Sequence, residues 1–124
     1  MPETGAGIGG TMSKVLLLNA FSLQMLSQDA EIYVQEVTPE WVTEQIQSYG
    51  VDSAVGHADT ARVLSNLLNA EIAFDRRNVS LEPGTCAVVA QVTGGRLPEG
   101  CTALPEGTNI KFLHVYVQEF DYSR

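Results

Sequence analysis

Four short clusters of polar and charged residues in this sequence could carry chemistry. They are Asn19-Ala20-Phe21-Ser22, Gly56-His57, Arg76-Arg77 and Arg96-Leu97-Pro98-Glu99-Gly100. Together they supply a histidine, arginines, a carboxylate and a hydroxyl, and no nucleophile–base pair stands out in the sequence. Such a set suits RNA cleavage, because RNA carries its own nucleophile in the 2′-hydroxyl. The protein then has to position the phosphate, neutralise its charge and protonate the leaving 5′-oxygen.

Two of the clusters could help to bind a ligand through backbone and polar groups. Asn19 to Ser22 directly follow an apolar stretch typical of a buried strand, and ligands often bind where such strands end. Gly56 and His57 open a predicted helix, whose free N–H groups favour anions. Both clusters also have an ordinary structural interpretation. Ser22 could be a helix cap beside a packed Phe21, and the His57 side chain could simply form a hydrogen bond with the first turn of its own helix.

The other two clusters supply positive charge. Arg76 and Arg77 are predicted to lie at a turn between two strands, where a solvated hairpin tip is the alternative. Arg96 offers a planar guanidinium that matches phosphate, and Glu99 three residues later could orient a hydroxyl or hold the arginine. A simple ion pair within the loop is the alternative for Arg96 and Glu99.

Composition limits the possible partners and cofactors. The formal net charge of −8 argues against general DNA or RNA binding, which needs a broad basic surface. Cys86 and Cys101 form no Cys-x-x-Cys pair, and His57 and His114 lie far apart, so no zinc-like spacing appears. We therefore expect neither a metal nor another cofactor. No apolar stretch reaches membrane-span length, and no signal peptide is evident, so a cytoplasmic location is expected.

The elements that must position these clusters can be read from periodicity and capping signals. Strands are predicted at 15–18, 31–37, about 71–74, 78–81, 85–92 and 111–120. A short helix is predicted after Ser22 with Leu23 and Leu26 facing inward, a second from Thr38-Pro39 to Gly50, and a third over about 57–69 with His57 near its inward stripe. Residues 51–56 and 94–100 are predicted to be loops. Along the last strand, alternate residues from Phe112 to Val117 are predicted to face opposite sides of the sheet.

This order of elements predicts an α+β (mixed α/β) fold: one domain over residues 13–124, with a small central sheet of about five strands flanked by helices. Residues 1–12 are interpreted as a flexible tail, or as an added leader before a native start at Met12. Their glycines match the spacing of a dinucleotide-binding fingerprint but follow no strand, so that function is rejected.

Three of the motifs resemble, in order, those of a known family. The stretch Val15 to Ser22, the stretch Val55-Gly56-His57 before an apolar helix, and the stretch Gly95 to Gly100 are similar to motifs of the type III anti-CRISPR and CRISPR-associated ring nucleases. These viral and bacterial proteins degrade cyclic tetra-adenylate. The resemblance extends over about Met12 to Phe120.

The resemblance implies a cytoplasmic homodimer that binds cyclic tetra-adenylate and cuts it, without a metal, to linear products ending in a 2′,3′-cyclic phosphate. Such an activity switches off or counters type III CRISPR antiviral signalling. By position, the resemblance implies that His57 would be the general acid and that Arg96 and Glu99 would flank the scissile phosphate. It also implies that Asn19 and Ser22 would hold the ring, with Ala20, Phe21 and Gly56 beside it. Either Arg76 or Arg77, with Arg77 preferred, would bind another phosphate.

Two other function classes compete with this hypothesis. A non-catalytic sponge or sensor would bind the cyclic nucleotide through the same arginines and the Asn19 to Ser22 turn, with no need of His57 as an acid. A small transcriptional regulator would need a DNA-binding surface. The acidic composition and the absence of a predicted recognition helix argue against that function.

Overall fold

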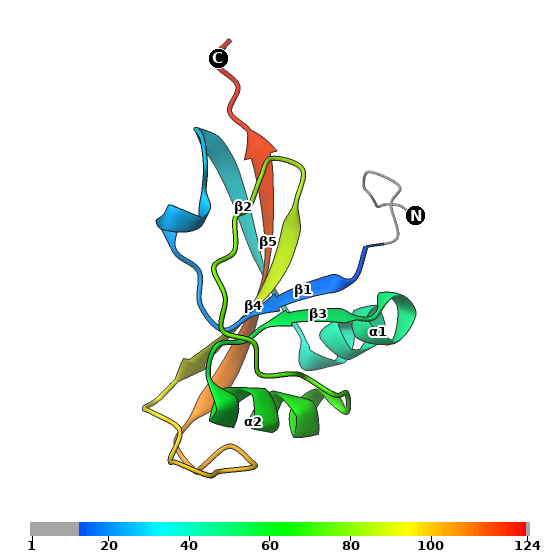
Figure 1. The fold of residues 1–124 in the computed structure, drawn as a ribbon, viewed down its shortest axis with the longest axis vertical. Helices are drawn as coiled ribbons and strands as arrows, with labels where there is room; N and C mark the ends of the chain where they lie inside the picture. The colour runs from blue at the N-terminus through cyan, green and yellow to red at the C-terminus, as the bar shows by residue number, and fades with distance from the viewer. Residues whose placement is uncertain (1–12, 124) are drawn as a thin grey trace.

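A mixed five-stranded sheet with strand order β2-β5-β4-β1-β3 organises the chain in the computed structural model, which describes residues 13–123 (Figure 1). The strands are β1 (Val15–Leu18), β2 (Ala30–Val37), β3 (Val51–Ala54), β4 (Cys86–Thr93) and β5 (Asn109–Glu119). The helices are α1 (Pro39–Tyr49), α2 (Ala58–Leu68) and the short 3-10 helix η2 (Leu23–Met25). The predicted α+β class with a small central sheet is confirmed. The predicted tail at 1–12 lies outside the described residues.

Strand direction divides the sheet into two parts. β1 pairs in parallel with both β3 and β4, whereas β5 runs antiparallel to β4 and to β2. Since β1, β3 and β4 run in the same direction, their carboxyl ends point toward the same edge of the sheet. This edge is where the polar clusters of the sequence are expected to meet.

The two α-helices begin and end at the predicted residues. Thr38 caps α1 by accepting a hydrogen bond from the Trp41 N–H at 3.0 Å, and Gly50 ends the helix with a positive φ of 82°. α2 begins after His57 and ends at Asn69, which adopts the left-handed conformation with a φ of 53°. Capping signals therefore located α1, and the apolar periodicity located α2.

Both helices pack on the same face of the sheet. Apolar side chains of α1 and α2 join those of β4 and β5 in one core cluster, which includes Val42, Leu64, Leu68, Ala90 and Phe112. The opposite face is covered by η2 and by the extended chain after α2. Phe112 belongs to the first cluster, while Val115 and Val117 belong to the second, so the predicted alternation along the last strand is confirmed.

Four predictions about local structure are wrong. Residues 51–54, predicted as a loop, form β3, because they pair in register with β1. Residues 71–74 and 78–81 form no strands; the isolated bridge between Val55 and Phe74 is the one pairing in this stretch. Ile72 and Leu81 are nevertheless buried, so their apolar pattern reflects packing without a partner strand. The segment after Ser22 makes a single 3-10 turn, in which Leu23 is 72% exposed rather than facing inward.

Neither α1 nor α2, each 11 residues long, nor η2 has the length and apolar character that a membrane span requires within residues 13–123.

Candidate functional site

Three of the four predicted clusters follow the carboxyl ends of the three parallel strands. Asn19 comes directly after β1, Gly56 and His57 come just after β3, and the loop containing Arg96 and Glu99 follows β4. Residues that follow parallel strands at the same sheet edge commonly line ligand sites. The topology therefore gives a physical reason for segments far apart in the sequence to share a site.

A cavity of about 320 Å³ at this edge, here called the basic pocket, contains most of the predicted residues. Its lining residues are Leu18, Asn19, Ala20, Met25, Ala54, Gly56, His57, Arg76, Arg77 and Val79. The structure thus brings together three of the four predicted clusters at least in part. The predicted turn between two strands at Arg76 and Arg77 is not present, because these arginines lie in the extended chain between α2 and β4.

His57 acts as the N-cap of α2. Its Nδ1 atom accepts a hydrogen bond from the Thr60 N–H at 3.3 Å and lies 3.3 Å from the Thr60 hydroxyl oxygen. The side chain is exposed rather than part of the predicted inward stripe. Because Nδ1 accepts from a backbone N–H, this geometry assigns the proton of the neutral ring to Nε2. The Nε2–H group is left to interact with a ligand.

Asn19 joins the end of β1 to the start of α2. Its side-chain oxygen accepts a hydrogen bond from the Gly56 N–H at 3.1 Å. Gly56 also lies against the next segment of the pocket, since a Cβ atom added there would be 3.2 Å from Cγ of Arg76. A residue without a side chain at position 56 lets Arg76 lie across the pocket wall.

Arg76 and Arg77 have different surroundings. Arg77 donates hydrogen bonds to Asp52 at 2.9 Å and to Asp75 at 2.8 Å, and the bond to Asp52 is the main cause of the raised pKa of its guanidinium. Within residues 13–123, Arg76 forms no ion pair and no side-chain hydrogen bond. The positive charge of Arg77 is neutralised by the protein, whereas that of Arg76 is not.

A second cavity, of about 330 Å³, lies on the sheet face opposite the helices and shares Asn19 and Ala20 with the basic pocket. The remaining lining residues are Phe21, Val34, Val89, Gln91, Leu113 and Val115. Phe21, a predicted ligand-binding residue, is therefore beside the basic pocket rather than in it. Ser22 lines neither cavity, and its hydroxyl accepts from the Gln24 N–H at 3.2 Å, so the capping alternative describes its position.

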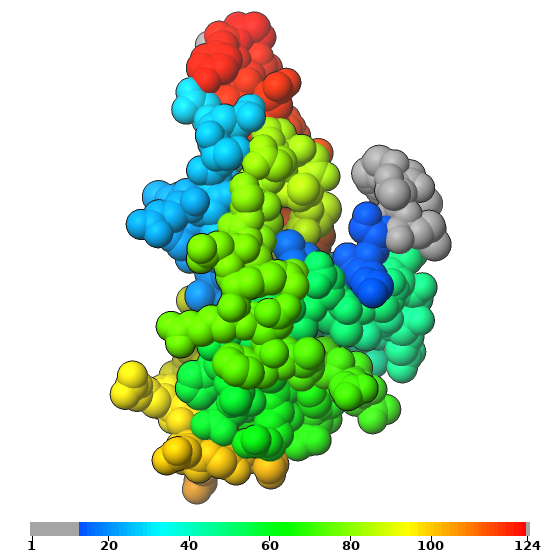
Figure 2. Space-filling model, viewed as in Figure 1, coloured from blue at the N-terminus to red at the C-terminus, as the bar shows by residue number. Residues whose placement is uncertain are grey.

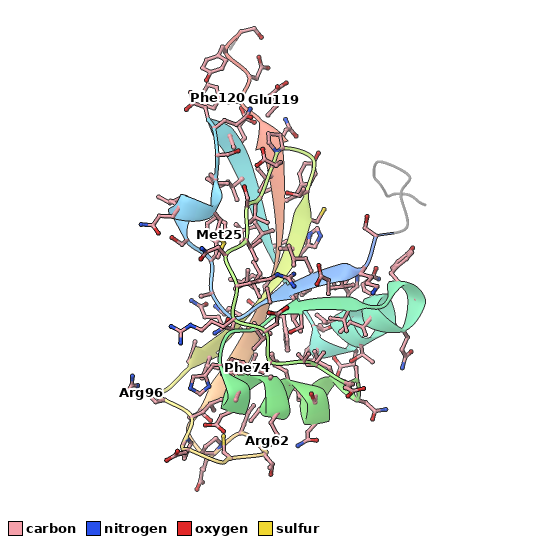
Figure 3. All side chains as sticks on the ribbon, viewed as in Figure 1. Met25, Arg62, Phe74, Arg96, Glu119 and Phe120 are labelled. Atoms are coloured by element: carbon pink, nitrogen blue, oxygen red, sulfur yellow. The ribbon has the colours of Figure 1, made fainter. Side chains whose placement is uncertain are left out.

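Arg96 and Glu99 lie outside the basic pocket in the single chain. Leu18, the last residue of β1, pairs with Val89 of β4. β4 continues to Thr93, so its end lies four residues, or about 13 Å, beyond the end of β1. Both side chains are exposed, and neither forms an ion pair within the described part of the chain. Figure 3 shows Arg96 pointing away from the body of the protein, and Figure 2 shows its loop protruding.

Two residues near the site were missed by the sequence reasoning. Thr60 contacts His57 through both its backbone and its hydroxyl, and Asp59 contacts the loop after β4. The His-x-x-Thr spacing at the helix start could have indicated Thr60, because an N-cap side chain interacts with the residue three positions later. No sequence signal indicates the contact of Asp59, since its partner, Gly100, is 41 residues away.

Comparisons with known proteins identify the relatives of this chain. A family model described as STIV B116-like matches residues 15–111. Uncharacterized protein 26 of Sulfolobus islandicus filamentous virus (isolate Iceland/Hveragerdi) is 31% identical over 85 residues, which make up 68% of this chain and 71% of that protein. The solved structure of B116 of Sulfolobus turreted icosahedral virus is similar with a TM-score of 0.68 and 24% identity, covering 84% of this chain and 99% of that one. The likeness to B116 shows the fold.

Proposed function

This chain belongs to the STIV B116-like family, and from that premise we propose that it is a viral ring nuclease that cleaves cyclic tetra-adenylate in the host cytoplasm and thereby counters type III CRISPR signalling. The reaction needs no metal, and its linear products end in a 2′,3′-cyclic phosphate. The proposal rests on the basic pocket together with the resemblance of three sequence motifs to those of ring nucleases.

One observation supports the proposal most strongly: Arg76 has no anionic partner within residues 13–123 and lies in a cavity with His57 and Asn19. An arginine that lines a pocket and has no carboxylate partner can bind a phosphate. The guanidinium of the arginine can donate two hydrogen bonds to the phosphate oxygens. The N–H groups at the start of α2 add to the attraction for an anion. Arg76, rather than Arg77, is therefore the residue proposed to bind phosphate.

The proposed cleavage uses the ring's own hydroxyl. The 2′-oxygen attacks phosphorus and the bond from phosphorus to the 5′-oxygen breaks, while the 2′-hydroxyl proton passes to water. Protonated His57 donates its Nε2 proton to the leaving 5′-oxygen. In that charge state Nδ1 also carries a proton, and the Nδ1–H group can donate a hydrogen bond to the Thr60 hydroxyl oxygen, 3.3 Å away, in place of the lost N-cap bond.

A homodimer completes the proposed site. A ring of four nucleotides has a twofold axis, so a twofold dimer can present identical residues to opposite phosphates. In this arrangement Arg96 and Glu99 approach the ring from their exposed loops. Both side chains are exposed and form no ion pair in the described chain, so they are free to contact the ring when the dimer binds it.

The test is incubation of the protein with cyclic tetra-adenylate in EDTA, with products identified by mass spectrometry. The expected product is a linear species with a 2′,3′-cyclic phosphate. His57→Asn should keep the α2 cap, because asparagine is a good N-cap residue, and should lower turnover by about 10²-fold or more. An intact ring after long incubation with the wild-type protein would overturn the enzyme proposal.

A sponge is the second candidate, and the N-cap contact favours it. His57 accepts from the Thr60 N–H through Nδ1, which requires a neutral ring, whereas a general acid must be protonated. Isothermal titration with cyclic tetra-adenylate distinguishes the two functions. Tight binding without turnover, unchanged in His57→Asn, would support the sponge. Retained binding with lost turnover in that variant would support the enzyme.

A further inference from the structure

The loop that carries Arg96 and Glu99 is attached to the helix that begins at His57. In this loop, which covers residues 94–108, the Gly100 N–H donates to Oδ1 of Asp59 at 3.1 Å, and Asn66 donates to the Thr102 carbonyl at 2.6 Å. Leu97, Cys101 and Leu104 also pack against the core cluster that α2 shares with the sheet. The loop is therefore held along α2 at two levels.

The Asp59 contact is the one nearest to the proposed chemistry. Asp59 is two residues after His57, and Gly100 immediately follows Glu99. The Asp59 side chain is 16% exposed, and its Oδ1 atom also accepts from Arg62 at 3.0 Å. One carboxylate oxygen thus joins the segment containing Arg96 and Glu99 to the first turn of α2, and Arg62 balances its charge.

From this geometry we propose that Asp59 is a positioning residue, which holds the Arg96–Glu99 segment in a fixed place relative to His57. This inference rests on the proposed function. The hydrogen bond from the Gly100 N–H to Asp59 does not itself contact substrate. It limits where the exposed side chains of Arg96 and Glu99 can reach. Catalytic groups that move by about 1 Å can lose about 10²-fold in rate, so a single anchor can matter.

The variants separate the anchor from the ion pair. Asp59→Asn keeps an oxygen that can accept from the Gly100 N–H but removes the negative charge. Asp59→Ala removes both the acceptor and the charge. Arg62→Gln is the matched control, because it removes the ion pair and leaves the Gly100 contact in place.

Two readouts are needed. The first reports the loop alone: hydrogen exchange of the Gly100 amide and the rate of trypsin cleavage after Arg96, which is exposed. Both should rise about 10-fold in Asp59→Ala and stay near wild type in Asp59→Asn and Arg62→Gln. The second is cleavage of cyclic tetra-adenylate, where kcat should fall about 10-fold to 100-fold in Asp59→Ala with little change in KM, and Asp59→Asn should restore most of it.

The outcomes distinguish the two proposals. Unchanged loop protection in Asp59→Ala would overturn the anchor while leaving the ring nuclease proposal intact. Absence of turnover in the wild type would overturn the ring nuclease proposal, and the exchange and proteolysis measurements would still test the anchor. An equal loss of kcat in Asp59→Asn and Asp59→Ala would show that charge, not the bond to Gly100, is what matters. If Asp59→Ala does not fold, Asp59→Ser, which is too short to reach Gly100 but is tolerated in a first helical turn, gives the same comparison.

Discussion

Arg76 and Arg77 are neighbours in the chain with different electrostatic surroundings. Arg77 is held by Asp52 and Asp75, whereas Arg76 borders the basic pocket with no carboxylate partner in the described residues. A side chain whose charge is already balanced has less to gain from a phosphate than one whose charge is not. The two residues therefore give a matched pair for testing which of them binds ligand.

We expect Arg76→Gln to weaken cyclic tetra-adenylate binding by about 10-fold or more, because a charged hydrogen bond to phosphate contributes about 1.5–3 kcal/mol. Arg77→Gln should change the affinity by much less, and should lower the thermal unfolding midpoint slightly through loss of its ion pairs. Isothermal titration and thermal unfolding of both variants measure these effects. The reverse order of affinities would identify Arg77 as the phosphate-binding residue.

We expect His114 to make the folded chain less stable in acid. Burial lowers its pKa below the usual value of 6.5, and its ring lies 5.5 Å from Trp41 in an edge-to-face contact. The unfolded chain therefore binds a proton at a higher pH than the folded chain does. The contribution of His114 to stability is complete above pH 6.5 and declines as the pH falls toward the lowered pKa of the folded state.

Urea unfolding between about pH 7.5 and 5, followed by fluorescence, tests this expectation, because Trp41 is the single tryptophan of the chain. The free energy of unfolding should fall with pH in the wild type, and His114→Gln should reduce the slope. His57→Asn is the control for the other histidine. Equal slopes in the wild type and His114→Gln would contradict the assignment.

At the scale of elements, α2 links the core to the candidate site. Its buried face contributes Leu64 and Leu68, both fully buried, to the main core cluster, while its N-terminus carries His57. Anything that shifts this helix on the sheet also moves His57 relative to Asn19. The packing of α2 on the sheet therefore fixes the position of His57 in the candidate site.

Two leucines of α2, three positions apart, test how firmly this helix is held. Leu64→Ala should lower the free energy of unfolding by about 2–5 kcal/mol, because it leaves a cavity in the core. Leu67→Ala, at a position 41% exposed on the same helix, should cost much less. Chemical denaturation measures both variants. Similar losses in the two would show that α2 packs differently from the arrangement in Figure 1.

In the molecule as a whole, the net charge is negative, but individual arginines without carboxylate partners give particular sites a positive charge. The net charge is −8, yet Arg76 and Arg96 have no carboxylate partners in the described part of the chain. Overall negative charge disfavours nonspecific binding to long nucleic acids, while a local basic pocket can still bind a small anion. A small cyclic nucleotide suits this distribution better than duplex DNA does.

If a twofold dimer surrounds the ring, the protein should migrate in solution as a dimer of its 13.4 kDa chain. Light scattering after size exclusion measures the mass directly. Cyclic tetra-adenylate should bind with one ring per two chains, which isothermal titration reports. A monomer that binds one ring per chain would contradict the proposed shared site.

Local features of the sequence predicted much of the fold and part of the site. The Thr38-Pro39 start and Gly50 end of α1, the extent of α2, and the alternation of β5 all follow from capping and periodicity, which involve residues a few positions apart. The same is true of Asn19, which was expected near the end of a buried strand, and of His57, which was expected at the start of a helix. These features depend on residues close together in the chain, so the sequence alone could predict them.

Tertiary structure alone decided the rest. The pairing of residues 51–54 with β1, the absence of strands at 71–74 and 78–81, and the order β2-β5-β4-β1-β3 depend on which distant segments meet. The difference between Arg76 and Arg77 depends on Asp52, 25 residues from Arg77, and the contact of Asp59 is with Gly100, 41 residues farther along the chain. Ion pairs and strand partners form through space, so residue types along the chain specify which contacts are possible, and the packing of the whole chain selects among them.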